Sequence, residues 1–193
     1  MRRRESPRLW QEDWVRRIAM FGYLALISGG VIALDQWTKV VVRANLALGE
    51  SWNPFDWLRP FVNITYWTNT GMAFGQFKSG GQVLTVVAFV VSGIIVWYYW
   101  NLPPGQWLVR TALGMQLGGA IGNLVDRIQV GTVTDFIEVT HFPVFNLADA
   151  SISVGVAALA VVLWLEGRRR KPSTGEQSPD PFAQPDKVPQ GNE

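Results

Sequence analysis

Two aspartates of this sequence stand in surroundings that suit catalytic chemistry. Asp135 lies between Thr134 and Phe136, and Asp149 lies in the run FNLADAS at 145–151. Neither has a basic residue within four positions. If two carboxyl groups share a pocket of low dielectric constant, one holds a proton while the other stays charged. The charged group can activate water, and the protonated one can bind a scissile carbonyl and protonate a leaving amine. The pair therefore indicates aspartyl-protease chemistry.

Further polar residues stand where apolar runs end. Asp35 and Lys39 are four positions apart in DQWTK, so on a helix they share a face and can pair. Asp126 and Arg127 close the run GGAIGNLVDR at 118–127, and we interpret them as a second pair that neutralises its own charge. Such pairs favour scaffolding or substrate orientation over catalysis.

Two asparagines accompany these acids. Asn123 shares a helical face with Asp126 and Arg127, and Asn146 shares one with Asp149 three positions later. Spacing alone leaves the role of the two lone aspartates open, because Asp149 can also serve only to stabilise the start of a helix.

The residue content excludes some mechanisms and leaves others open. There is no cysteine, which excludes a thiol nucleophile, a disulfide framework and a zinc–thiolate site, and there is a single histidine. Three alternatives to a protease remain. One is a transporter or proton channel, and another is an assembly factor that tolerates loss of both acids. The third is a metal-dependent hydrolase with Asp126, Asp135, Glu138 and His141 as ligands. The protease interpretation expects no metal, cofactor or nucleic acid.

Long apolar segments must carry these residues. The chain has 193 residues, of which 48% are hydrophobic, and its charges concentrate at 1–17 and 166–193. This composition indicates an all-α polytopic membrane protein. A helix needs roughly 20 apolar residues to cross a bilayer. We predict four transmembrane helices, at about 15–36, 82–100, 106–126 and 146–166, with NLPPG at 101–105 ending the second helix. A cleaved signal peptide is a less favoured reading of the first span, since signal cores run to ~7–15 residues.

The four spans divide the chain into a basic N-terminus at 1–14, a membrane domain at 15–166 and a tail at 167–193. The tail is rich in Pro, Gln and Ser, which is typical of disorder. With four spans, twelve of the Lys and Arg residues lie on the side of both termini and five on the other side. Both termini are therefore expected in the cytoplasm. An inner aromatic belt is expected from Trp10, Trp14, Trp97, Tyr98, Tyr99, Trp100, Trp107 and Trp164.

The outward segments and a run of small residues complete the expected architecture. Residues 61–67 alternate and are rich in β-branched and aromatic side chains, which predicts a strand, and Gly131–Val139 is expected to be extended too. Gly114, Gly118, Gly119 and Gly122 line one side of the third span. Glycines in this pattern permit close contact between helices.

Four motifs in order, from about Leu34 to Gly155, resemble those of the lipoprotein (type II) signal peptidases, a family of aspartyl peptidases. They are LDQWTK at 34–39, NTGMAFG at 69–75, GGAIGNLVDRIQVGTVTDFI at 118–137 and FNLADASISVG at 145–155. The resemblance implies a monomeric endopeptidase of the bacterial inner membrane, with its active site near the extracytoplasmic face. Its substrate would be a prolipoprotein with a diacylglyceryl-modified cysteine, cleaved just before that cysteine.

The resemblance also implies roles for single residues. It makes Asp135 and Asp149 the catalytic pair. Four further matched residues would line the site and touch substrate or the inhibitor globomycin, namely Asn69, Asn123, Arg127 and Asn146. Asp35 and Lys39 would maintain the site. Asp126 would support the fold. The family has a small extracytoplasmic β-cradle, in agreement with the predicted strand. Phe74 is a candidate wall of the pocket.

Overall fold

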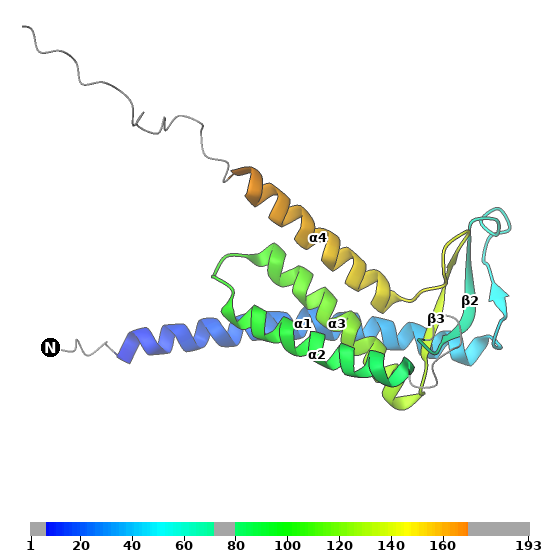
Figure 1. The fold of residues 1–193 in the computed structure, drawn as a ribbon, viewed down its shortest axis with the longest axis horizontal. Helices are drawn as coiled ribbons and strands as arrows, with labels where there is room; N and C mark the ends of the chain where they lie inside the picture. The colour runs from blue at the N-terminus through cyan, green and yellow to red at the C-terminus, as the bar shows by residue number, and fades with distance from the viewer. Residues whose placement is uncertain (1–6, 72–79, 170–193) are drawn as a thin grey trace, which may run out of the picture.

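The computed structural model describes residues 7–71 and 80–169, and side chains at 14–71 and 81–168. Four helices and three short strands lie in these ranges. They are α1 (Pro7–Asn45), β1 (Ser51–Trp52), β2 (Val62–Asn69), α2 (Gly80–Asn101), α3 (Trp107–Gln129), β3 (Val133–Val139) and α4 (Leu147–Arg169). Figure 1 shows the sheet at one end of the helices and the α2–α3 connection at the other end. Helix α4 includes the first three residues of the expected tail, whereas the rest of the tail, 170–193, and Phe74 lie outside the described residues.

Three of the helices are long and apolar enough to cross a membrane, in the ranges Trp14–Asn45, Gly81–Asn101 and Leu147–Arg168. The fourth helix, α3, is more polar than the sequence interpretation assumed, because Arg110, Asn123, Asp126 and Arg127 lie on it. It contacts α1, α2 and α4. A helix enclosed by three others does not need an apolar surface all round, so its polar residues can face protein instead of lipid.

Glycines allow α3 to lie close to its neighbours. A Cβ atom on Gly118 would stand 2.7 Å from the Val31 Cβ and 2.8 Å from the Ser28 carbonyl oxygen, both on α1. A Cβ on Gly119 would collide with the Ala148 carbonyl oxygen on α4. The glycine stripe therefore serves helix packing, as the spacing predicted.

Helix α1 extends well beyond its predicted end near residue 36 and reaches Asn45. The apolar run stops at Leu34, but the polar residues that follow do not end the helix. Asp35 and Lys39 are fully buried and make their ion pair within the protein. The helix can continue because its polar face is turned inward rather than toward lipid.

The sheet has the strand order β1–β2–β3, with both pairs antiparallel. The predicted strand at 61–67 is confirmed as β2, and the predicted extended segment at 131–139 is confirmed as β3. The register sets Trp67 opposite Asp135 and Asn69 opposite Val133, with an irregularity between Ile64 and Trp67.

At the opposite end, the aromatic residues divide into two groups. Trp14, Trp100 and Trp107 are exposed on the helices, as expected for a belt at a membrane interface. Tyr99 is only 1% exposed and packs in the core with Leu24 and Ile95. Its hydroxyl donates a hydrogen bond to the backbone carbonyl of Met20. Tyr99 therefore does not belong to the belt that the sequence predicted.

Candidate active site

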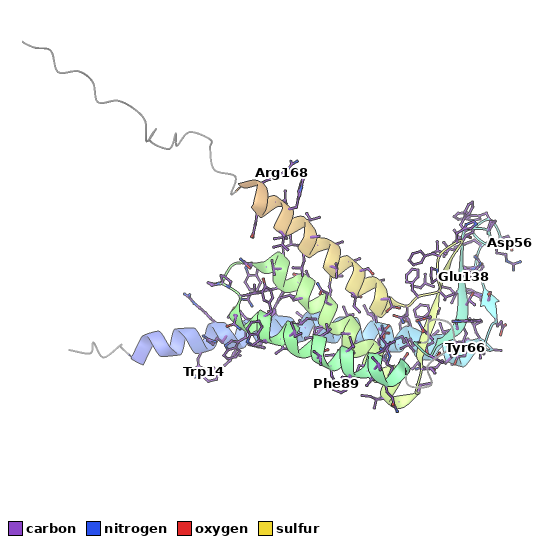
Figure 2. All side chains as sticks on the ribbon, viewed as in Figure 1. Trp14, Asp56, Tyr66, Phe89, Glu138 and Arg168 are labelled. Carbon is purple, nitrogen blue, oxygen red and sulfur yellow. The ribbon has the colours of Figure 1, made fainter. Side chains whose placement is uncertain are left out.

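The predicted site residues gather where the C-terminal part of α1, the end of α3, strand β3 and the start of α4 meet. Figure 2 places Glu138 of β3 and Tyr66 of β2 at this end, whereas Trp14 and Arg168 lie at the other end of the helices. Seven predicted residues form one connected network of hydrogen bonds and ion pairs, namely Asp35, Lys39, Asn69, Asn123, Asp135, Asn146 and Asp149. Asp126 joins it through Lys39.

Strand β3 brings Asp135 next to the start of α4. Beyond the strand, His141 adopts a left-handed conformation (φ 66°) and the chain turns back. Phe145 then forms an antiparallel bridge with Ile137, through N–H···O bonds of 2.7 and 3.1 Å. Asn146 follows directly, so its side chain reaches Asp135 across this bridge.

Asn146 caps helix α4 and joins it to the site. Its side-chain oxygen accepts a hydrogen bond from the backbone N–H of Asp149 at 2.9 Å. The backbone N–H of Asn146 in turn donates to the Asp149 carboxylate at 3.4 Å. This reciprocal pattern is a capping box, with Asn146 at N-cap and Asp149 three residues later. The next free N–H, that of Ala148, donates to Asp35 on α1 at 3.0 Å. The sequence motif FNLAD thus starts the helix and orients an acid.

Two asparagine amides connect the two lone aspartates. Asn146 donates to Asp135 at 2.7 Å and to the side-chain oxygen of Asn123 at 3.1 Å. Asn123 in turn donates to Asp149 at 2.7 Å. The carboxyl groups of Asp135 and Asp149 are therefore fixed by one chain of hydrogen bonds, although they come from a strand and a helix.

The Lys39 ammonium fixes the orientation of both amides. It contacts the Asp35 carboxylate at 2.8 Å, the Asp126 carboxylate at 3.3 Å and the Asn123 side-chain oxygen at 3.0 Å. Because an ammonium only donates, the amide oxygen of Asn123 must face it and the NH₂ must face Asp149. The NH₂ of Asn146 must then face that same oxygen and Asp135. A fully buried lysine thus determines which groups reach the acids.

Asn69 supplies the third amide of the site. It stands two positions after Trp67, which pairs with Asp135, so its side chain lies on the same face of the sheet as that acid. It donates to Asp135 at 3.0 Å. Asp135 is 1% exposed, whereas Asn69 is exposed and Asp149 is partly exposed. The site is thus reachable from its Asn69 and Asp149 side.

The expected pair of Asp126 with Arg127 is wrong. Asp126 contacts Lys39 and Arg43, the latter at 3.4 Å, and accepts the backbone N–H of Thr134 at 2.9 Å. Adjacent residues of a helix point about 100° apart, so Asp126 faces α1 while Arg127 does not. Arg127 forms no salt bridge with Asp126 among the described side chains and donates to the backbone oxygen of Asn123 at 3.5 Å.

The sequence interpretation missed three residues of this network. Arg43 donates to the Thr134 hydroxyl at 2.8 Å, and Gln36 donates to Asp35 at 3.1 Å and to the Gly122 carbonyl oxygen at 3.0 Å. A signal for Arg43 was present, because it follows Asp35 and Lys39 at intervals of four and extends their helical face. Thr134 carries no signal of its own, since its partner lies 91 positions away.

The surroundings favour the neutral form of Asp135. The pKa of its carboxyl group is raised from 3.8 to about 6. Burial is the main cause and the charge of Asp149 adds to it, while hydrogen bonds from Asn69 and Asn146 and the charge of Lys39 oppose the shift. A carboxyl group with this pKa keeps a proton in mildly acidic solution. The arrangement thus offers a proton donor next to a partly exposed carboxylate.

The alternative metal site lacks a suitable geometry. Of its four candidate ligands, Asp126 is occupied by Lys39 and Arg43, and Glu138 accepts a hydrogen bond from Thr65. Among the residues that the structure describes, no three His, Asp or Glu side chains are placed to hold one metal ion. The donor set of a metal-dependent hydrolase does not assemble from Asp126, Asp135, Glu138 and His141.

Comparison with known proteins connects this geometry to an activity. Residues 27–165 match a sequence family described as signal peptidase (SPase) II. The chain is 40% identical over 161 residues to the lipoprotein signal peptidase of Moorella thermoacetica, an alignment that covers 83% of this chain and 99% of the relative. It is 41% identical over 157 residues to that of Mesorhizobium japonicum, covering 79% and 90%.

Solved structures are similar as well. A bacterial membrane enzyme determined by the in meso method at 2.3 Å resolution superposes with a TM-score of 0.71 at 27% identity, covering 78% of this chain and 93% of the other. A second such structure, at 1.9 Å resolution, gives a TM-score of 0.68 at 28% identity, covering 74% and 92%. The similarity therefore extends over most of the chain.

Proposed function

Because the chain belongs to the signal peptidase II family, and so removes signal peptides from prolipoproteins as an aspartic-type protease, we propose that Asp135 and Asp149 are its catalytic pair. One observation carries this proposal, namely the hydrogen-bond chain through Asn146 and Asn123 that holds the two carboxyl groups in one site.

In the proposed reaction, Asp135 holds the proton and Asp149 is the charged base. Asp149 removes a proton from a water molecule whose oxygen attacks the scissile carbonyl carbon, and Asp135 gives its proton to the carbonyl oxygen. The resulting diol collapses when Asp149 returns the proton to the amide nitrogen and Asp135 takes one back from a hydroxyl group. The C–N bond breaks, a carboxylic acid and an amine leave, and the pair returns to its starting state.

The assignment of the two roles follows the environment of each acid. The raised pKa of Asp135, caused first by burial, favours the protonated form. Asp149 is partly exposed, so water can reach it, and the N–H groups at the start of α4 lie beside it. A helix N-terminus is a favourable place for a negative side chain, which suits the position to the role of the base.

We further propose four membrane crossings within a domain at about 15–166, with α3 as the fourth. Its 23 residues would measure about 34 Å, enough for a hydrocarbon core of about 30 Å. Basic residues favour cytoplasmic termini in the bacterial inner membrane. This orientation would put the sheet and the Asp135–Asp149 pair, called the dyad below, at the extracytoplasmic face. The three-stranded sheet would then be the β-cradle beside the site.

The proposed substrate is a prolipoprotein with a diacylglyceryl-modified cysteine, cut immediately before that residue. Its lipid chains would stay in the bilayer, and its backbone would enter from the exposed side formed by Asn69 and Asp149. Asn69, Asn123, Asn146 and Arg127 are proposed to orient the peptide or the inhibitor globomycin. We propose that the enzyme acts as a monomer.

The test compares an aspartate of the network with an aspartate outside it, in purified protein. Asp149→Asn is expected to slow cleavage of a diacylated prolipoprotein, followed by mass spectrometry, by roughly 10²–10⁴-fold. Asp56→Asn is the matched control, because this acid is 95% exposed in the loop before β2 and outside the network. Cleavage by Asp149→Asn at the wild-type rate would overturn the proposal. Ion flux in proteoliposomes without proteolysis would favour the transporter alternative instead.

A further inference from the structure

A cavity lies at the end of the helices opposite the dyad. It has a volume of about 470 Å³ and lies between the early part of α1, the end of α2 and the start of α3. Its lining includes Arg16, Arg17, Phe21, Trp100, Trp107 and Arg110. Figure 1 shows that the α2–α3 connection stands at this end, and Figure 2 shows Trp14 of α1 there too. The catalytic proposal uses none of these residues.

Arg110 forms the base of this cavity. It is 1% exposed and donates to the carbonyl oxygens of Leu102 at 2.9 Å and Pro103 at 3.3 Å, while its guanidinium lies 4.6 Å from the centre of the Tyr99 ring. Within the described side chains, no carboxylate lies in salt-bridge range of it. The carbonyl groups at the end of α2 satisfy its hydrogen bonds but leave its full positive charge without a counter-ion.

Two further arginines stand at the mouth. Arg17 lies 4.7 Å above the ring of Trp100, and Arg16 precedes it on the same helix, both exposed. Among the described residues that line the cavity, none is acidic. Glu166, the acid of α4 at this end, lines two neighbouring hollows and not this one. The charges that the described residues bring to this cavity are therefore all positive, which favours an anion.

The walls between these charges are apolar. Met20, Phe21 and Leu102 line the cavity together with the indole rings of Trp100 and Trp107. A free phosphate ion keeps its hydration and gains nothing from such walls. A phospholipid combines a phosphate with a glycerol and acyl chains, and indole rings are enriched where these parts meet in a bilayer.

We propose that this cavity binds the headgroup of an anionic phospholipid, with its phosphate facing Arg16, Arg17 and Arg110 and its glycerol against Trp100 and Trp107. Basic pockets between membrane helices are suited to such headgroups. The site is independent of the dyad. A bound lipid would connect α1 to the α2–α3 turn and would neutralise the buried charge of Arg110.

The experiment is a lipid titration of the full chain in detergent, followed by native mass spectrometry. The probes are dioleoyl phosphatidylglycerol, dioleoyl phosphatidylcholine and inorganic phosphate. The test variant is Arg16→Gln/Arg17→Gln, since both side chains are exposed and the change leaves the core intact. The matched control is Arg168→Gln, because Arg168 also lies over an indole, 4.0 Å from Trp164, but lines no part of this cavity.

We expect the wild type to bind phosphatidylglycerol at least 5-fold more tightly than phosphatidylcholine. The double variant should lose affinity for phosphatidylglycerol by about 10- to 25-fold, since each arginine contributes about 5-fold at an anionic headgroup. Arg168→Gln should bind as the wild type does.

Three outcomes would overturn the proposal. Equal affinity of the wild type for both lipids would remove the headgroup preference. An equal loss in Arg168→Gln would assign the effect to general surface charge. Displacement of the lipid by inorganic phosphate at micromolar concentration would assign the site to a soluble anion.

Discussion

The side-chain amide of Asn146 donates to Asp135 at 2.7 Å, across the bridge between Phe145 and Ile137. The same side chain caps α4 through its oxygen. One residue therefore sets both the start of a helix and the position of a carboxyl group on a strand, and its two duties can be separated by substitution.

Asn146→Ser should retain much of the fold and lose most of the activity. Serine is as good an N-cap as asparagine, so the melting temperature in detergent should stay near that of the wild type. Its hydroxyl is too short to reach Asp135 and Asn123 together, and a misplaced catalytic group costs about 10²-fold in rate. Asn146→Ala, which lacks the cap as well, should lower both quantities. Full activity in the serine variant would contradict the positioning role.

Lys39→Met should destabilise the protein strongly, because it leaves the buried carboxylates of Asp35 and Asp126 without their shared cation. Removing one member of a buried ion pair costs about 3–5 kcal/mol. Arg59→Met is the control, since its pair with Asp56 is exposed and worth at most about 1 kcal/mol. Thermal unfolding in detergent measures both. Equal melting temperatures for the two variants would refute the structural importance of Lys39.

The pH profile of cleavage should report the proton on Asp135. Because its pKa is raised to about 6, the free enzyme loses this proton as pH rises through that value, and kcat/KM should fall on that side. The hydrogen bond from Asn69 lowers the pKa, so Asn69→Ala should raise it and move the fall to higher pH. Asn63→Ala, on the same strand but opposite Glu138, should leave the profile in place. A shift of the Asn69→Ala profile to lower pH would contradict this assignment.

Gly122→Ala should disturb the site although it adds one methyl group. A Cβ atom there would stand 2.7 Å from a carboxylate oxygen of Asp35, which holds Lys39 and the start of α4. We expect lower activity and a cost of about 1–3 kcal/mol from overpacking. Gly93→Ala on α2 has open space around it and should change neither activity nor melting temperature. Wild-type behaviour of both variants would show that α1 can move away freely.

The sequence predicted those features that depend on neighbours along the chain. The break between α2 and α3 follows from Pro103 and Pro104, the strand β2 follows from alternation, and the family follows from four ordered motifs. The pair of Asp35 with Lys39 was predictable because both lie on one helical face. The catalytic roles of Asp135 and Asp149 stay a prediction until the substitutions are made.

Features that depend on contacts between distant segments could not be predicted in this way. Sequence proximity suggested Arg127 as the partner of Asp126, but the partners on α1 lie more than 80 positions away. The polar end of α1 looked like the end of a span, because nothing in the sequence indicates that α3 covers it. Tyr99 looked like a belt residue for the same reason, although its ring is enclosed by neighbouring helices.

The capping box at the start of α4 has a consequence for drug resistance. A compound that occupies the site through Asn146 and Asp149 binds the residues that start the helix. Most changes of either residue that let a bacterium escape the compound would also weaken the start of that helix, and a change that keeps the cap, such as Asn146→Ser, would still lose the bond to Asp135. Escape routes should therefore concentrate on residues around the pocket rather than on its polar centre.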